Sequence, residues 1–259
     1  MTDNRHAEAL SKVPALTLGF WVIKILATTL GETAGDTVSM TMNLGYLVGT
    51  AIFATLLVVL VWWQMRARTF QPWLYWATII ASTTAGTTMA DYATRSMGIG
   101  YTGGSALLLG CVLMSLLVWH RSTGSISVTT VQSSKTEMFY WITITFSQTL
   151  GTALGDWAAD TGGLGYLGGA VLFGAGLLAL LALYFWTTAS RVFLFWAAFI
   201  LTRPLGATVG DFLDKPLDRG GLDFSRPLAS LVLAVAIAAL IFLLPQRAGK
   251  HPESENKAT

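Results

Sequence analysis

Residues 21–36 read WVIKILATTLGETAGD, and the same framework returns as WATIIASTTAGTTMAD at 76–91, WITITFSQTLGTALGD at 141–156 and WAAFILTRPLGATVGD at 196–211. Every copy has a tryptophan, a glycine ten positions later, a small residue four positions after that, and then an aspartate. Four copies without a gap indicate an internal repeat rather than chance similarity.

Each repeat has a second half, which opens with Gly-Tyr in the first three copies, at Gly45-Tyr46, Gly100-Tyr101 and Gly165-Tyr166. The fourth copy instead has the charged connection DKPLDR at 214–219, so we expect a specialised loop there. Successive aspartates lie 55, 65 and 55 residues apart, and the ten extra residues fall in a Ser/Thr-rich stretch. We therefore predict two halves of two repeats: repeats 14–66, 72–120, 138–187 and 191–246, a linker at 121–137, and polar tails at 1–13 and 247–259.

The composition points to a membrane protein. Hydrophobic residues make up 53% of the 259 residues and charged residues only 12%, whereas a soluble domain has about 25% charged residues. Long apolar runs lie near 14–40, 44–64, 73–95, 101–119, 138–160, 165–186, 192–213 and 226–245, each close to the ~20 residues that cross a bilayer. The predicted fold is all-α: a polytopic bundle of eight transmembrane helices, built from four parallel two-helix repeats. Segment 1–12 is too polar for a signal peptide, so we expect no cleavage.

Four tandem two-helix units, each with a tryptophan and the Gly-x3-(Gly/Ala)-Asp signature, resemble a bacterial family of inner-membrane proteins defined by a repeat of unknown function. The resemblance covers nearly the whole chain and implies location in the inner membrane. It implies no substrate and no cofactor, so the residues themselves must indicate the function.

One face of each first helix is polar. Residues four and eight positions before the aspartate share its face of the helix. With Lys24 one turn further along, these positions are predicted to line a pathway: Lys24 and Thr28 in the first repeat, Thr83 and Thr87 in the second, Gln148 and Thr152 in the third, and Arg203 in the fourth. Only Ala207 interrupts the pattern. Such faces are not expected to point at lipid.

The aspartates are the leading candidates for cation ligands. Each lies 15 residues after its tryptophan, which places all four at one depth, ~22 Å from the tryptophan level. Acidic groups inside the hydrocarbon cost about 2.5–3.5 kcal/mol each, and oxygen ligands suit Mn²⁺, Mg²⁺ or Ca²⁺ rather than Zn²⁺ or Cu⁺. We predict a metal site formed by Glu32, Asp36, Asp91, Asp156 and Asp211, beneath an acidic outer mouth. The alternative is that the aspartates only cap helix ends.

The other marked residues have structural interpretations that remain open. The small-xxx-small glycines favour close helix packing. The repeated tryptophans favour an interfacial belt, with an aromatic gate as the alternative. Lys24 either lines the pathway or extends to the surface. Arg203 either pairs with Glu32 or an aspartate, or binds an anion. The single cysteine, Cys111, is interpreted as packing.

The function that these patterns favour is transport of a hard divalent cation, with manganese as a candidate, coupled to protons. The alternatives are transport of a small organic cation or polar solute, and a membrane scaffold or sensor that transports nothing. We predict no enzymatic activity, because the sequence has no catalytic signature and no histidine in the apolar runs. The expected partners are the lipid bilayer, a small cation and protons, with no cofactor and no nucleic acid. Glu32 has no symmetric copy, so Glu32→Gln is expected to abolish flux and leave the fold intact.

The distribution of lysine and arginine predicts cytoplasmic termini. Tails and loops between repeats carry ten of these residues, against four in the loops within repeats, and cytoplasmic loops carry the excess of positive charge. A reporter enzyme that works only in the periplasm should therefore be inactive when fused after Thr259, and one that works only in the cytoplasm should be active. The reverse result would invert the proposed orientation.

Overall fold

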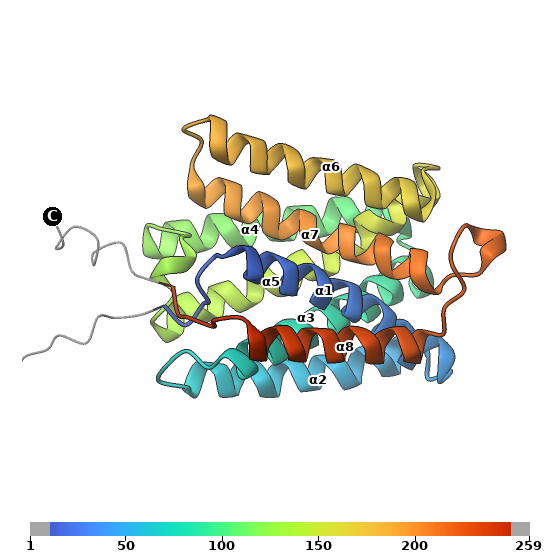
Figure 1. The fold of residues 1–259 in the computed structure, drawn as a ribbon, viewed down its shortest axis with the longest axis horizontal. Helices are drawn as coiled ribbons and strands as arrows, with labels where there is room; N and C mark the ends of the chain where they lie inside the picture. The colour runs from blue at the N-terminus through green and yellow to red at the C-terminus, as the bar shows by residue number, and fades with distance from the viewer. Residues whose placement is uncertain (1–10, 250–259) are drawn as a thin grey trace, which may run out of the picture.

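Eight long helices follow one another along residues 11–249, which are the residues that the computed structural model describes (Figure 1). The predicted tails 1–13 and 247–259 lie mostly outside this range. The helices are α1 (Leu18–Asp36), α2 (Gly45–Arg66), α3 (Pro72–Asp91), α4 (Gly100–Thr123), α5 (Ser134–Asp156), α6 (Gly165–Trp186), α7 (Arg191–Asp214) and α8 (Arg226–Leu243). Residues 11–249 contain no β-strand and only one isolated bridge, between Pro14 and Ala248. The predicted all-α bundle of eight helices is confirmed.

The turn inside each of the first three repeats has one construction. A π-helical turn of five residues follows the aspartate directly, at Thr37–Thr41, Tyr92–Ser96 and Trp157–Thr161. The glycine of each Gly-Tyr pair then adopts a left-handed φ, 77° at Gly45, 72° at Gly100 and 65° at Gly165, which a residue without Cβ does at little cost. In the fourth repeat α7 continues to Asp214, and the charged loop replaces this turn, as predicted.

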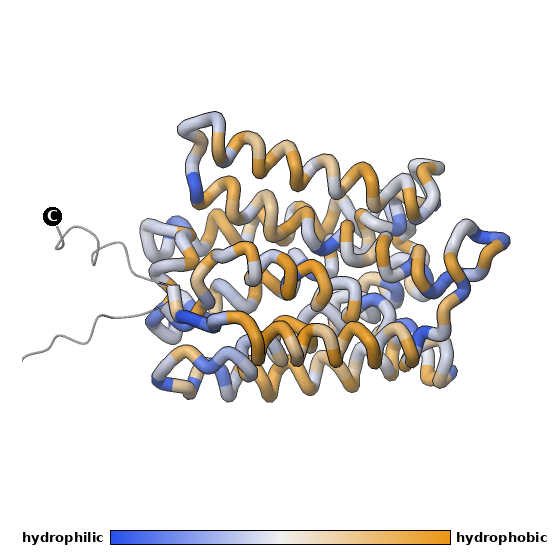
Figure 2. The backbone as a smooth tube through the Cα atoms, viewed as in Figure 1, coloured by the Kyte–Doolittle hydropathy of each residue, from blue (hydrophilic) through white to orange (hydrophobic). Residues whose placement is uncertain are grey.

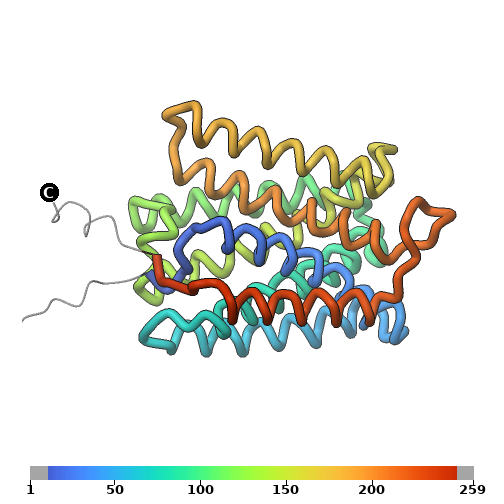
Figure 3. Tube along the Cα trace, in the orientation of Figure 1, coloured from blue at the N-terminus to red at the C-terminus, as the bar shows by residue number. Residues whose placement is uncertain are grey.

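The four first helices form an inner ring in which α1 packs on α3, α3 on α5, α5 on α7, and α7 on α1. Each second helix packs outside this ring, on the first helix of the following repeat: α2 on α3, α4 on α5, and α6 on α7. The last helix, α8, closes the circle by packing on α1 (Figure 3). The four repeats are therefore joined in one closed ring.

Glycines set the spacing of the inner ring, as the small-xxx-small pattern predicted. A Cβ on Gly31 would meet Thr83, one on Gly86 would meet Gln148, one on Gly151 would meet Arg203, and one on Gly206 would meet Thr28. The glycine that follows the tryptophan by ten positions thus faces, in the next repeat, the residue eight positions before the aspartate. The glycine of the fourth repeat faces that position in the first repeat. Close backbone approach is what small residues provide between membrane helices.

The outer surface is apolar along the middle of the helices and polar at the ends (Figure 2). Among the described helices, α2, α4, α6, α7 and α8 are long and apolar enough to cross a membrane. The inner helices α1, α3 and α5 are less apolar because their threonines and charged groups face the centre of the ring, where α2, α4, α6 and α8 screen them from lipid.

The stretch predicted as the linker 121–137 is mostly ordered. Helix α4 extends to Thr123, a 3₁₀ turn covers Val128–Thr130, and α5 begins at Ser134. Val128 and Val131 are buried in the main hydrophobic core, and the indole of Trp196 donates to the carbonyl of Ile126 at 2.9 Å. The two ends of the described chain meet beside this segment, where the Ser11 hydroxyl donates to the Val128 carbonyl. The segment therefore covers the end of the bundle where both ends of the described chain lie (Figure 1).

The glycine contacts predict a clear effect of adding one methyl group. Gly206→Ala would place Cβ 2.8 Å from the backbone of Thr28, which a rotamer change cannot relieve. Overpacking of this kind costs about 1–3 kcal/mol. Gly174→Ala is the matched control, because nothing lies within 4 Å of its added Cβ. Thermal unfolding in detergent should show a lower midpoint for Gly206→Ala and no loss for Gly174→Ala. Equal midpoints would mean that the ring is not closed through this contact.

Candidate functional site

The polar columns lie inside the ring. The side chains of all seven predicted pathway residues are fully buried, with 0% exposure: Lys24, Thr28, Thr83, Thr87, Gln148, Thr152 and Arg203. The five predicted ligand carboxylates, on Glu32, Asp36, Asp91, Asp156 and Asp211, are exposed by at most 2%. The predicted inward orientation of these residues is confirmed.

The guanidinium of Arg203 lies at the centre of this interior. One of its terminal nitrogens, Nη2, donates to Glu32 Oε2 of α1 at 3.0 Å, to Thr87 Oγ1 of α3 at 2.6 Å, and to Thr152 Oγ1 of α5. The other, Nη1, reaches the Thr28 carbonyl of α1 at 3.4 Å. One side chain from α7 thus binds the other three inner helices. Of the two interpretations of Arg203, the ion pair with Glu32 is the one observed.

Lys215 lies one layer above Arg203. It sits between two of the four repeat aspartates, which we call the ring aspartates: Asp36, Asp91, Asp156 and Asp211. Its Nζ contacts Asp36 Oδ2 at 2.5 Å and Asp211 Oδ1 at 2.8 Å, and a third carboxylate, Asp214, lies at 3.7 Å. Burial lowers the pKa of Lys215, but these three carboxylates outweigh it and raise that pKa well above its ordinary value. The ammonium is therefore a cation that the chain itself supplies to the site. Arg226 flanks it, 3.2 Å from Asp214 and 3.8 Å from Asp36.

The other two ring aspartates share Arg95. Its Nε lies 2.9 Å from Asp91 Oδ1 and its Nη2 lies 3.2 Å from Asp156 Oδ2. The guanidinium also lies beside the rings of Tyr46 and Tyr101, whose centroids are 6.0 and 5.7 Å away. These are the tyrosines of two Gly-Tyr pairs, so those pairs help to hold Arg95 over the ring.

Sequence reasoning placed Arg95 and Lys215 in loops and missed their role. Both stand four residues after a ring aspartate, where the first and third repeats have Met40 and Asp160. A basic residue in the second and fourth repeats thus alternates with a non-basic residue in the first and third, and this alternation is visible in the sequence. It divides the four ring aspartates into two pairs. Asp91 and Asp156 are held by an arginine, whereas Asp36 and Asp211 are held by a lysine.

One group of carboxylates is close enough to share a cation. Glu32, Asp36 and Asp211 each offer an oxygen, and these atoms lie within 4.8 Å of one another. Asp36 Oδ1 is buried and has no hydrogen-bond partner among the described residues. Of the five predicted ligands, these three are the ones that the described structure brings within this distance of one another. Asp91 and Asp156 are outside this group, on the arginine side of the ring.

A cavity of about 770 Å³ lies directly above the ring, at the end of the bundle opposite the described chain ends. Its charged lining consists of Arg95, Lys215, Arg219, Arg226, Asp160 and Asp218. Four basic groups thus face two acidic ones, and the prediction of an acidic mouth is wrong. The ring carboxylates that suggested it are buried beneath the arginine and lysine side chains that neutralise them.

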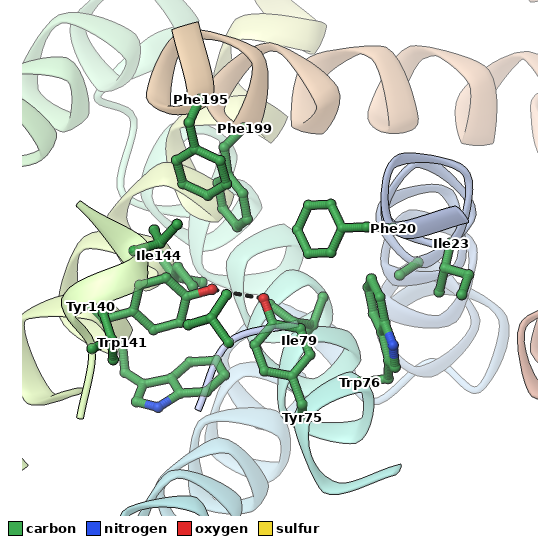
Figure 4. Packing of buried hydrophobic residues seen from close by; sticks show 14 of the residues in the cluster. Phe20, Ile23, Tyr75, Trp76, Ile79, Tyr140, Trp141, Ile144, Phe195 and Phe199 are labelled. Carbon is green, nitrogen blue, oxygen red and sulfur yellow. Dashed lines mark hydrogen bonds between the residues drawn. The ribbon is translucent and has the colours of Figure 1, made fainter. Parts of the chain in front are cut away.

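The opposite end of the interior is closed by aromatic side chains (Figure 4). Phe20, Tyr75, Tyr140 and Phe195 extend from the four inner helices toward one another, and the hydroxyls of Tyr75 and Tyr140 are 2.7 Å apart. We call these four residues the aromatic plug. Each immediately precedes a repeat tryptophan, a pattern that sequence reasoning overlooked.

The repeat tryptophans pack around the plug and do not form an interfacial belt. Trp76, Trp141 and Trp196 are at most 3% exposed, and Trp21 is partly buried against the same core. Other tryptophans face outward. Trp62, Trp63, Trp73 and Trp186 are each more than half exposed near the helix ends on the side of the described chain ends, and Trp157 is 38% exposed at the opposite end. The belt prediction was wrong because a tryptophan at a fixed depth says nothing about which side of its helix it occupies.

A family model described as "Repeat of Unknown Function (DUF347)" matches the chain four times, at residues 19–70, 74–125, 139–190 and 194–246. The matches coincide with the four two-helix units and cover most of the chain. No curated protein and no solved structure gives a significant match.

The Arg203 ion pair revises the expectation for Glu32→Gln. The change would leave a buried guanidinium without its carboxylate, and breaking a buried pair in this way costs about 3–5 kcal/mol. We expect Glu32→Gln to be clearly destabilised in detergent unfolding, and Glu32→Gln combined with Arg203→Met to recover most of the loss. Asp160→Asn, an exposed carboxylate at the cavity, is the control and should change little. Wild-type stability of the single Glu32→Gln variant would contradict a structural role for the pair.

Proposed function

The chain belongs to this repeat family, and we propose that it transports a hard divalent cation, with Mn²⁺ the leading candidate, in exchange for protons. The observation that carries the proposal is the buried group of Glu32, Asp36 and Asp211, whose carboxylate oxygens lie within 4.8 Å of one another. Carboxylate oxygens are the ligands that Mn²⁺, Mg²⁺ and Ca²⁺ prefer. Carboxylates at membrane depth are costly, and their usual role there is in ion pathways and proton relays.

Lys215 supports the proposal because its ammonium already occupies a cation position between Asp36 and Asp211. A lysine is a compact charge on a flexible stem, whereas an arginine is a rigid, permanently charged fork. An incoming cation can therefore displace Lys215, and Asp214, 3.7 Å away, offers the ammonium another carboxylate. Arg95 has no comparable freedom, since it holds Asp91 and Asp156 together.

The count of charges in the ion-paired network also favours a cationic substrate. The ion-paired network at the ring contains six carboxylates, on Glu32, Asp36, Asp91, Asp156, Asp211 and Asp214, and four basic groups, on Arg95, Arg203, Lys215 and Arg226. Two negative charges are left over. Buried charge without a partner is strongly unfavourable, so this network is suited to hold one divalent cation or two protons.

The two ends of the interior differ as alternating access requires. The carboxylate group lies beneath the cavity of about 770 Å³, and the aromatic plug closes the interior on the side of the described chain ends. A substrate would enter from the cavity, and release on the other side would require the plug to open. A membrane scaffold that transports nothing would not require an open cavity at one end and an aromatic plug at the other.

One observation favours a second candidate, a small polar or zwitterionic solute. The cavity is far larger than a bare ion, falls within the roughly 300–1,000 Å³ typical of small-molecule pockets, and has both charges and two tyrosines in its lining. Uptake assays should therefore include amino acids and small organic cations as competitors. Inhibition of Mn²⁺ flux by such a solute, with transport of the solute itself, would favour this alternative.

The division of the ring gives a matched pair of variants. Asp211→Asn removes a proposed ligand, whereas Asp156→Asn removes a carboxylate of the same repeat position that pairs only with Arg95. In proteoliposomes, Mn²⁺ flux should fall by roughly tenfold or more for Asp211→Asn, the factor that 1.4 kcal/mol of lost binding represents. Asp156→Asn should retain most of the flux. Equal losses in both variants, or no Mn²⁺ flux by the wild type, would overturn the proposal.

A further inference from the structure

Three segments outside the eight long helices meet at the end of the bundle where the described chain ends lie. We call them the strap, and they are residues 11–15, 126–131 and 244–249. The first segment pairs with the third at an antiparallel bridge between Pro14 and Ala248, which two backbone hydrogen bonds of 2.8 and 2.9 Å flank. These two segments are therefore joined to each other.

The first segment also binds the second, which joins α4 to α5. The Ser11 hydroxyl donates to the Val128 carbonyl at 2.8 Å, and the Lys12 N–H donates to the Val131 carbonyl at 3.1 Å. The Lys12 ammonium reaches the start of α5, where it lies 2.8 Å from a carboxylate oxygen of Glu137. Helix α5 is the inner helix opposite α1, because the ring neighbours of α1 are α3 and α7. The chain that leads into α1 therefore crosses the mouth of the ring.

The strap lies against the aromatic plug. Val13, Val128 and Val131 of the strap are at most 6% exposed and belong to the hydrophobic core that contains the four plug side chains. The indoles of Trp76 and Trp196, which pack beside the plug, donate to oxygen atoms of the strap at 3.1 and 2.9 Å. A substrate that passed the plug would therefore meet the strap next.

The ion pair of Lys12 and Glu137 is the latch of the strap. Glu137 is 1% exposed, and Lys12 is its only cationic partner among the described residues. The same ammonium donates to the Met65 carbonyl near the end of α2 at 3.2 Å. A buried carboxylate without its cation is strongly unfavourable, so charge as well as apolar contact holds the strap closed. Segments outside helices, with few backbone hydrogen bonds, are nevertheless the ones that open locally.

We infer that the strap is a second gate, whose first and second segments must part before the cation is released at this end. The inference rests on the proposed function and adds its exit step. The first and third segments continue into α1 and α8, which pack on each other, whereas the second belongs to α4 and α5 across the ring. Opening therefore breaks the bonds from Ser11 and Lys12 to the second segment. The bridge between Pro14 and Ala248 stays intact.

Cross-links within and across this division test the gate. All variants carry Cys111→Ser, which removes the one native cysteine. Ser11→Cys with Val128→Cys joins the first segment to the second and locks the strap shut. Pro14→Cys with Ala248→Cys is the matched control, because its cross-link joins two segments that move together. The thiols are joined by oxidation or by a short bifunctional reagent, and mass spectrometry measures the loss of free thiol.

The expected result is a loss of transport in the locked variant alone. In proteoliposomes its Mn²⁺ flux should fall by about tenfold or more, because release requires the strap to open, and reduction of the cross-link should restore it. Flux through the control should be the same before and after cross-linking. Calorimetry should show that the locked variant still binds Mn²⁺, since the carboxylate group lies beneath the cavity at the other end.

A second measurement follows opening without Mn²⁺. Val13 is 2% exposed, so a water-soluble maleimide can label Val13→Cys only when the strap lifts. Lys12→Met removes the latch and should speed this labelling by roughly tenfold or more, since the buried carboxylate loses its partner. Lys135→Met is the control, because Lys135 is exposed and its ammonium donates to the Ser122 carbonyl of the adjoining segment. Equal labelling rates in the two variants would rule out the latch.

Three transport results would overturn the inference, and they differ. Undiminished Mn²⁺ flux through the fully cross-linked pair at 11 and 128 would show that the strap is not a gate, and would leave the proposed transport intact. Equal loss of flux in both cross-linked pairs would reject the division between the first and second segments. No Mn²⁺ flux by the wild type would remove the proposed function, and the gate for the cation with it.

Discussion

The Arg203 guanidinium is the interaction on which the interior depends. It is buried where the four inner helices meet, and it binds Glu32, Thr87 and Thr152 together. A charge in that place is stable only with a carboxylate and several acceptors around it, and Gly151 leaves the room for its stem. Four arginines could not share one centre, because their charges would repel. The scaffold is therefore nearly fourfold, but its centre must be asymmetric. Glu32 and Arg203 are central positions at which the residue type differs from that of the other repeats.

This asymmetry continues into the layer above. Arg95 and Lys215 occupy equivalent positions in the second and fourth repeats and bridge equivalent pairs of aspartates. A guanidinium and an ammonium differ in mobility and hydration, so one pair is fixed and the other can exchange its partner. The pair with the lysine is also the pair next to Glu32. Exchangeable carboxylates and the central ion pair thus lie on the same side of the ring.

The sequence alone predicted the features that follow from the spacing of residues within each repeat. The spacing of Trp21, Gly31 and Asp36, repeated four times, was enough for the eight helices, the inward columns and the close glycine contacts. It could not show contacts between distant repeats: Lys215 reaches Asp36 across 179 positions, and the pairing of α8 with α1 depends on closure of the ring. The acidic mouth failed for the same reason, since acidic residues were counted without the basic side chains that fold over them. Trp76 was misplaced because its depth in the helix does not determine whether it faces lipid or the centre.

The displacement of each outer helix onto the next repeat has a consequence for how the protein is made. Helices α3, α5 and α7 are each covered by the helix that directly precedes them in the chain, which the ribosome has already completed. Helix α1, which carries Lys24, Glu32 and Asp36, is covered by α8, the eighth helix of the described chain. Until α8 is inserted, this charged helix has one flank open to lipid or to the translocation machinery. Completion of the polar interior therefore waits for α8, and a chain that stops before α8 leaves those charges unshielded.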